Sequence, residues 1–289
     1  MVPTKNPEPE SAMAPPLKSR CRFCQTTEGK RSNEHVLRRK FKKLMWTYPD
    51  TFYSYAENGT VQHSRRVNAT AFDVKVNEVC KACNEGWLEE LEDDVEAMVM
   101  TLARGKTPSD EEAHWDKLAL WMTVRALLRT LTDPEQSRIP KRVFESIYRD
   151  RAVPEDFIVM WARTKSYYLP GGRSMIRWHG RKNHKAGDAP VGFDGTVSYG
   201  IGRLFFQVHI CSESNAAKGL IAGHALHVME VSPDAWMVIF PEVTELPTPG
   251  NILDEFTAMS AAASPQRDDP TLNVLGTREA HGVFGQRTR

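Results

Sequence analysis

Two C-x-x-C pairs place the strongest constraint on how this chain folds. Cys21 and Cys24 form the first pair, and Cys80 and Cys83 form the second pair 55 residues later. Each pair can present two thiolates from a tight turn, so the two pairs together complete a tetrahedral Zn(Cys)₄ site. The gap is longer than the about 15–20 residues of compact zinc ribbons, which predicts a folded insert between the pairs. We therefore predict a structural zinc ion bound by the four cysteines.

A redox-active pair and a coincidental spacing are the alternatives to a metal site. A redox C-x-x-C usually opens a helix in a βαβ unit, and a second such pair would be surplus. The fifth cysteine, Cys211, stands alone in an apolar, strand-like run. Because the count is odd and the N-terminus does not resemble a signal peptide, we expect thiols or metal ligands and a cytoplasmic protein. No stretch approaches the about 18 apolar residues of a membrane span, so we expect no membrane partner.

The 289 residues are enough for one large domain or two ordinary ones, and 40% hydrophobic content is enough to form a core. Residues 1–17 are rich in Pro, Glu, Ser and Ala, which predicts a disordered leader, and 261–289 predict a disordered tail. A turn-like break at 104–108 separates a first domain over 18–103 from a second over 109–260.

Hydrophobic periodicity predicts an α+β fold. Residues 51–79 are rich in strand formers around an Asn58-Gly59 turn signal, and 38–46 predict a basic helix. An amphipathic helix of roughly 17 residues starts near Trp87. After the break the pattern predicts a helix ending near Leu131, a second helix over 141–150, and an antiparallel β-rich region from Asp156 onward.

Charge is unevenly distributed although the net charge is only +1. Residues 18–83 carry fourteen Lys and Arg against six Asp and Glu, whereas residues 85–96 carry seven acidic side chains and no basic one. A basic lobe attracts polyanions through phosphate contacts and counterion release, which makes nucleic acid a candidate partner. A solvated basic surface is the alternative interpretation.

Two further features lie beside the cysteine pairs. Glu34-His35 follows the first pair, and Asn84 comes directly after Cys83 at the expected start of a helix, so the chain reads CRFC, EHVL and CKACN in that order. This order resembles the zinc-stabilised members of the HNH nuclease family, also called ββα-metal or His-Me finger nucleases. The run CNEGW followed by a glutamate also resembles a subgroup of bacterial and phage HNH endonucleases. The resemblance covers about residues 18–103.

The resemblance implies a treble-clef-like ββα-metal module, followed here by a helical segment and an antiparallel β-rich domain of unknown role. It implies that His35 is the general base for phosphodiester hydrolysis and that Glu34 and Asn84 hold one divalent cation. Carboxylate and amide oxygens are hard ligands, which favours Mg²⁺ or Mn²⁺. Asn77 would be the middle asparagine that braces the hairpin. DNA would be the substrate. Five basic residues after the His motif would contact its phosphate backbone: Arg38, Arg39, Lys40, Lys42 and Lys43.

A non-catalytic zinc-finger protein that binds nucleic acid or a protein partner is the alternative function. Asn84 could equally cap the helix that follows it, a frequent position for asparagine. The joint occurrence of Glu34, His35 and Asn84 around two cysteine pairs favours the enzyme.

Overall fold

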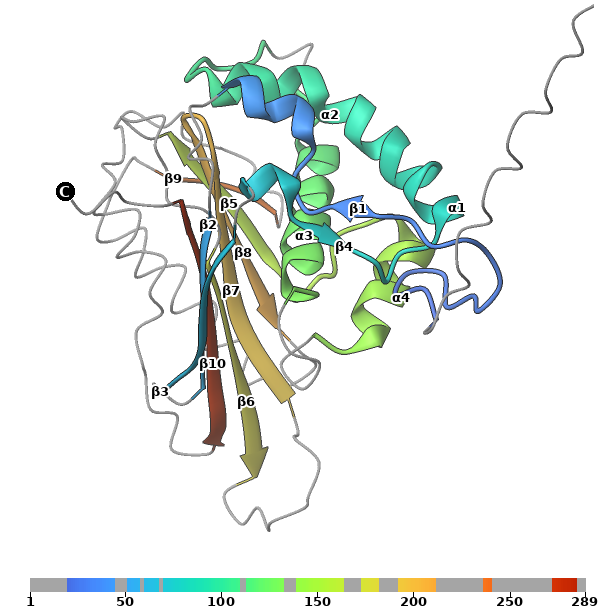
Figure 1. Ribbon diagram of the computed structural model, residues 1–289. Helices are drawn as coiled ribbons and strands as arrows, with labels where there is room; N and C mark the ends of the chain where they lie inside the picture. Colours follow the sequence, from blue (N-terminus) through green and yellow to red (C-terminus); the bar gives the residue numbers. More distant parts are fainter. Residues whose placement is uncertain are drawn as a thin grey trace, which may run out of the picture.

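A computed structural model describes most of the chain between residues 20 and 284. The described ranges are 20–44, 51–57, 60–67, 70–109, 113–132, 139–163, 173–181, 192–211, 236–240 and 272–284. The fold is α+β, with the helices gathered on one side of a large sheet (Figure 1). The leader predicted over 1–17 lies outside the described residues.

The large sheet has eight strands and is antiparallel throughout. Its strand order is β3-β2-β10-β6-β7-β8-β5-β9, which brings together strands from the first and the last parts of the chain. Its strands are β2 (Thr51–Glu57), β3 (Thr60–Val67), β5 (Ile158–Arg163), β6 (Arg173–Arg181), β7 (Gly192–Ile201), β8 (Leu204–Cys211), β9 (Trp236–Phe240) and β10 (Leu272–Phe284). The β2–β3 hairpin is the folded insert expected between the cysteine pairs, and the antiparallel β-rich region is confirmed.

A second, two-stranded sheet pairs β1 (Glu34–His35) with β4 (Lys75–Val76). The remaining elements are η1 (Arg39–Leu44), η2 (Ala71–Asp73), α1 (Lys81–Asn84), α2 (Trp87–Ala103), α3 (Trp115–Thr130) and α4 (Lys141–Asp150). The 17-residue helix expected from Trp87 and the helix expected over 141–150 are both confirmed. The basic helix expected over 38–46 is a six-residue 3₁₀ helix, in which Phe41 is the buried residue.

The tail predicted to be disordered contains a 13-residue strand, and that part of the prediction is wrong. Strand β10 pairs with β2 along one edge and with β6 along the other (Figure 1). Both partners lie more than 90 residues away in sequence. Composition reports only what a segment favours locally, whereas this strand's backbone is paired by distant partners.

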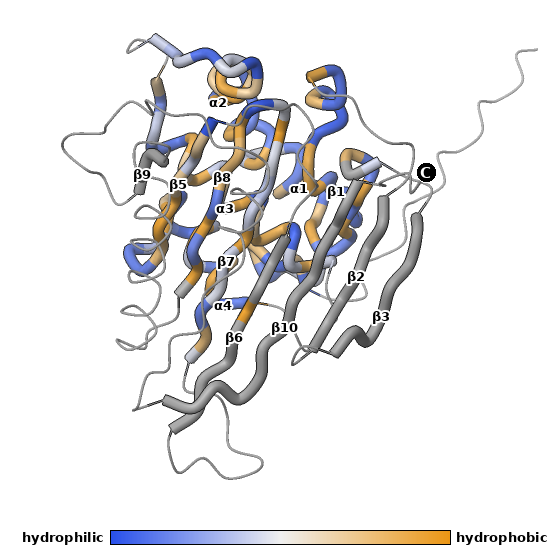
Figure 2. The backbone as a smooth tube through the Cα atoms, turned by 90° about the vertical axis from the view of Figure 1, so that its left-hand side faces the viewer, coloured by the Kyte–Doolittle hydropathy of each residue, from blue (hydrophilic) through white to orange (hydrophobic). Residues whose placement is uncertain are grey.

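Helix α3 lies at the centre of the molecule. One side of α3 packs on β5, β7 and β8, where Trp121 meets Phe206 with ring centroids 5.9 Å apart, and another side packs on α2. Figure 2 shows apolar residues concentrated along α3 and the strands that it faces. One buried apolar cluster runs from Cys21 to Ile210 and includes residues of both predicted domains. Within the described residues, no helix is both long and apolar enough to span a membrane.

The end of α2 docks on the turn between β7 and β8. The Arg203 amide donates to the carbonyl of Ala103 over 2.8 Å, and the neighbouring Gly202 has a φ of +58°. A Cβ atom at Gly202 would lie 2.5 Å from the Ala103 carbonyl oxygen, which is backbone and cannot move aside easily. Glycine is therefore required here for both conformation and space.

We expect Gly202→Ala to lower the free energy of unfolding by at least about 2 kcal/mol, from left-handed strain plus the clash with α2. Gly105→Ala is the matched control, because Gly105 also has a positive φ (+77°) but its Cβ would meet only the Arg203 side chain. Urea unfolding of the two variants measures the difference. Equal destabilisation would show that the close approach of α2 does not matter.

Candidate metal centre

Backbone pairing brings the two cysteine pairs together. The amide of Arg22 donates to the Glu78 carbonyl at 2.9 Å, and the Arg22 guanidinium forms an ion pair with the Glu78 carboxylate at 2.6 Å. Further along, Arg31 forms an isolated β-bridge with Cys80. The first pair itself sits in a tight turn that is closed by a bond from the Gln25 amide to the Cys21 carbonyl, with Gln25 at φ +58°. Segment 20–32 is thus attached along segment 78–81.

The four sulfur atoms form a compact cluster. All lie within 4.8 Å of one another, with Cys21 and Cys83 Sγ 3.9 Å apart and Cys24 and Cys80 Sγ 3.6 Å apart. Sulfurs at the corners of a Zn(Cys)₄ tetrahedron are separated by roughly 3.8 Å, given a Zn–S bond of about 2.3 Å. These four cysteines could therefore hold a metal ion such as zinc.

The surroundings of the sulfurs suit thiolate ligands. The Cys80 amide donates to Cys21 Sγ and the Cys83 amide donates to Cys80 Sγ, each over 3.4 Å. The hydrogen bond between the Cys21 and Cys83 side chains lowers the pKa of Cys21 to about 5 and raises the pKa of Cys83. Burial raises the pKa of Cys80 to about 11. Four thiolates at this spacing repel one another, so a cation is what allows all four to ionise together.

We expect the purified protein to contain one zinc ion per chain, and Cys83→Ser to lose it. Cys83 is buried, so the loss of a thiolate there leaves the metal without a replacement ligand from solvent. Metal analysis and thermal unfolding before and after chelation measure the effect. Cys211→Ser is the control, since Cys211 stands outside both C-x-x-C pairs, at the end of β8. Zinc retained at full stoichiometry in Cys83→Ser would contradict the site.

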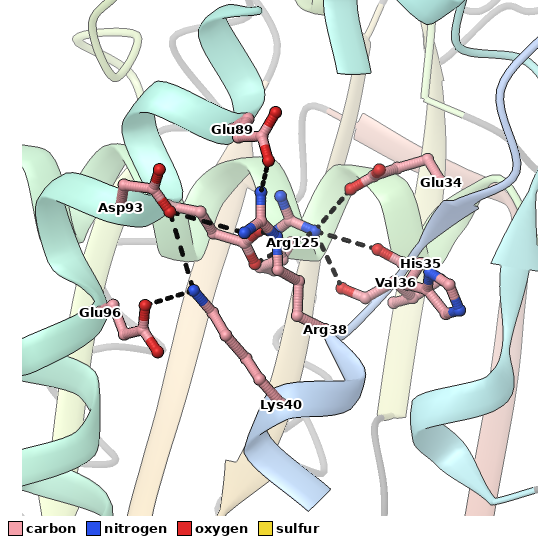
Figure 3. Close-up of polar contacts among 10 residues, drawn as sticks. Glu34, His35, Val36, Arg38, Lys40, Glu89, Asp93, Glu96 and Arg125 are labelled. Atoms are coloured by element: carbon pink, nitrogen blue, oxygen red, sulfur yellow. Dashed lines mark hydrogen bonds and ion pairs between the residues drawn. The ribbon is translucent and has the colours of Figure 1, made fainter. Parts of the chain in front are cut away.

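Glu34 and His35 are adjacent on β1 but face opposite sides of the strand (Figure 3). The Glu34 side chain is buried and forms an ion pair with Arg125 of α3, Oε1 to Nη1 2.8 Å. The His35 ring points away from Arg125 and is partly buried, and its Nε2 has no hydrogen-bond partner within the described residues. Burial is the main cause that lowers the pKa of His35, with the nearby Lys75 charge adding to it. The neutral imidazole, which can accept a proton, is therefore favoured.

The two asparagines occupy different places. Asn84 is the last residue of α1, partly buried, and its amide donates to the Cys80 carbonyl at 3.0 Å. Because Gly86 is the N-cap of α2, the alternative role of Asn84 as the cap of that helix does not apply. Asn77 follows β4 and is exposed. No hydrogen bond or ion pair among the described residues joins either asparagine to Glu34 or His35.

The basic residues after the His motif divide into two groups. Arg38 forms ion pairs with Glu89, Glu92 and Asp93 of α2. Lys40 likewise pairs with Asp93 and, at 2.5 Å, with Glu96 (Figure 3). The acidic run of α2 thus neutralises part of the basic run.

The second group stays more exposed. Arg39 and Lys42 are 64% and 43% exposed and both lie near Asp73, at 3.1 and 4.0 Å. Lys43 is exposed and forms no ion pair within the described part of the chain. These three residues remain available to an anionic partner.

Arg125 is the residue at this site that the sequence did not single out. It is fully buried in the middle of α3 and bonds through Nη1 to the Glu34 carboxylate and, at 3.0 Å, to the His35 carbonyl oxygen. A signal for it was present, because Arg125 is the one charged residue in the otherwise uncharged run from 118 to 128. Such a residue on a buried helix requires a partner.

We expect Arg125→Met to lower the free energy of unfolding by roughly 3–5 kcal/mol, because it leaves the Glu34 carboxylate buried without its counter-charge. Lys117→Met is the matched control. Lys117 also lies on α3 and pairs with α2 through Asp94 at 2.9 Å, but that pair is exposed and should contribute little. Denaturant titration compares the two, and equal losses would contradict a special role for the buried pair.

No family model, curated protein or solved structure that we compared with this chain matches it.

Proposed function

We propose that the protein is a metal-dependent DNA endonuclease built on a zinc-stabilised HNH module. The observation that carries the proposal is the order in which the cysteine cluster connects the local elements. The cluster joins the first cysteine turn to the segment that follows β4, and from there directly to the helix that carries Asn84. His35 lies on β1, which pairs with β4, and its ring nitrogen Nε2 has no partner within the described residues. This order of elements supports the proposal of a ββα-metal module.

His35 is the proposed general base. Its Nε2 is buried and has no partner among the described residues, and burial favours the neutral form of the ring, so no other hydrogen bond competes for this proton acceptor. The zinc site would not take part in the chemistry. Four protein thiolates leave no open coordination position. Zinc would therefore hold the β1–β4 pair and α1 in place.

A second, divalent cation is proposed for the phosphate chemistry. When bound, Mg²⁺ or Mn²⁺ would neutralise charge on the scissile phosphate and on the leaving oxygen. Asn84 is the proposed protein ligand with the fewest competing interactions, because its side chain has no hydrogen-bond partner in the described part of the chain. Glu34, the other proposed ligand, already has one carboxylate oxygen bound to Arg125.

The proposed DNA contacts are carried by the exposed basic residues rather than by all five. Within the described residues, Lys43, Arg39 and Lys42 are accessible and pair with at most one carboxylate, Asp73, whereas Arg38 and Lys40 each pair with at least two on α2. Exposed cations that follow a phosphate backbone contribute to affinity through counterion release. We therefore assign Lys43, Arg39 and Lys42 to DNA and Arg38 and Lys40 to the attachment of η1 on α2.

A non-catalytic zinc-finger protein is the second candidate, and one observation favours it. The Glu34 carboxylate is buried and occupied by Arg125, which removes an oxygen ligand from the surface where a catalytic cation would bind. Such a protein would still bind DNA through its exposed basic residues. The two candidates differ in whether His35 matters.

We expect the wild-type protein to nick or cut plasmid DNA when Mg²⁺ or Mn²⁺ is added, and His35→Ala to be slower by roughly 10²–10⁴-fold, the usual contribution of a general base. Zinc content and DNA affinity should stay unchanged in that variant. His114→Ala is the control, since His114 is an exposed residue at the start of α3 without a side-chain capping bond.

Gel analysis of supercoiled plasmid against a panel of metals gives the rates. If zinc-loaded wild-type protein cleaves no form of DNA with any metal of the panel, the nuclease proposal is rejected. Salt-sensitive DNA binding that is indifferent to His35→Ala would then support the zinc-finger candidate.

A further inference from the structure

We infer that Arg125 is the positioning residue of the His35 segment and that Glu34 is its buried counter-ion rather than a ligand of the divalent cation. The inference deepens the proposed function, on which the role of His35 as a base rests. The contacts between the Arg125 guanidinium and β1 do not depend on the proposed function.

One nitrogen of Arg125 holds three consecutive residues. Nη1 donates to Glu34 Oε1 at 2.8 Å, to the His35 carbonyl oxygen at 3.0 Å and, more weakly, to the Val36 carbonyl oxygen at 3.5 Å. These three acceptors converge on the guanidinium from the same side, while the His35 ring points the other way (Figure 3). Because the His35 backbone is held by these bonds, the direction in which its side chain leaves the strand is set as well.

Strand β1 needs such an anchor because it is very short. It has two residues, and its ladder partner among the described residues is β4, which also has two. A two-stranded ribbon of this length is marginally stable by itself. The contacts from α3 therefore provide a third side of support, and they come from beyond the region that contains the cysteines and the His motif.

The charges around Arg125 are balanced and almost completely buried. Glu34 is 6% exposed, Glu92 is 1% exposed and Arg125 has no exposed surface. Glu92 Oε1 lies 3.8 Å from Arg125 Nη1, and its other oxygen pairs with Arg38, so positive and negative groups alternate from Arg38 to Glu34. A charge in this setting keeps its partner, because separating the pair leaves an unpaired buried charge.

This setting determines what Glu34 can do. If Glu34 bound a hydrated divalent cation, its carboxylate would have to leave Arg125, or the cation would have to lie next to the buried guanidinium. The second arrangement is unfavourable because the two positive charges repel each other. Asn84 has no competing partner among the described residues. Asn84 would therefore be the protein ligand of the cation, which water and the DNA phosphate would complete, and Glu34 would act through the position of His35.

The test uses full-length protein with ¹⁵N-labelled histidine and compares Glu34→Gln, Arg125→Met, and the double variant. The double variant replaces both charges with neutral groups of similar size, so it should fold even if Arg125→Met alone does not. We expect each folded variant to keep its zinc and to shift the His35 ring signals, which are assigned by their absence in His35→Ala. Arg125→Lys should restore the ring signals in part, because it keeps the charge but not the planar fork.

Activity gives the second readout. We expect kcat to fall by roughly 100-fold in Arg125→Met with little change in KM, as for a misplaced base. The double variant should lose no more than Arg125→Met, because both changes act through one group. Lys117→Met on the same helix should change neither signals nor rates.

Two results would overturn the inference. One is unchanged His35 ring signals in the double variant, which would show that Arg125 and Glu34 do not position the ring. The other is losses that multiply, which would show an independent role of Glu34 such as metal binding. If the wild-type protein has no cleavage activity, the proposed function is rejected. The His35 ring signals would still show whether Arg125 positions His35.

Discussion

The four-cysteine cluster is the constraint on which the first half of the structure depends. Segments 20–32 and 78–83 meet through backbone hydrogen bonds and through a bond from the Cys80 amide to the Cys21 sulfur. Cys21 and Cys83, which are 62 residues apart in sequence, lie in contact there. A metal at this point would close a long loop and convert its binding energy into folding energy. Strand β4 lies shortly before Cys80 in sequence and α1 begins directly after Cys80, so the cluster lies next to the β1–β4 pair and to α1.

The second constraint is the pairing of opposite charge runs. The sequence carries a basic run before the β2–β3 insert and an acidic run after it, and the fold places η1 against α2 so that the two meet. Two residues of the basic run, Arg38 and Lys40, are consequently used in ion pairs within the fold. Arg125 of α3 belongs to neither run, but its buried ion pair with Glu34 joins α3 to β1, and separating that pair would leave an unpaired buried charge.

The regular elements could be predicted where the chain's local pattern agrees with its tertiary environment. Helix α2 follows from periodicity, helix α4 follows from the pattern after Pro140, and the cysteine cluster follows from spacing alone. Strand β10 could not be found in this way, because its hydrogen-bonding partners β2 and β6 are remote in sequence. Arg125 was missed for a related reason. Periodicity shows which helix face is apolar, but it does not show which carboxylate on another segment pairs with a single charge on a buried helix.

The position of Arg125 also bears on why the two halves of the chain belong together. Strands β2 and β3 interrupt the cysteine-bearing region and join the sheet formed by the later strands, while α3 reaches back from the later region to β1. Each half therefore completes the other at a different point. A cut between them at 104–108 would separate Glu34 from Arg125 and remove the edge that β10 uses on β2. The proposed catalytic histidine would then lie on a two-residue strand without its anchor, so the later region contributes to the site even though it carries none of the motif residues.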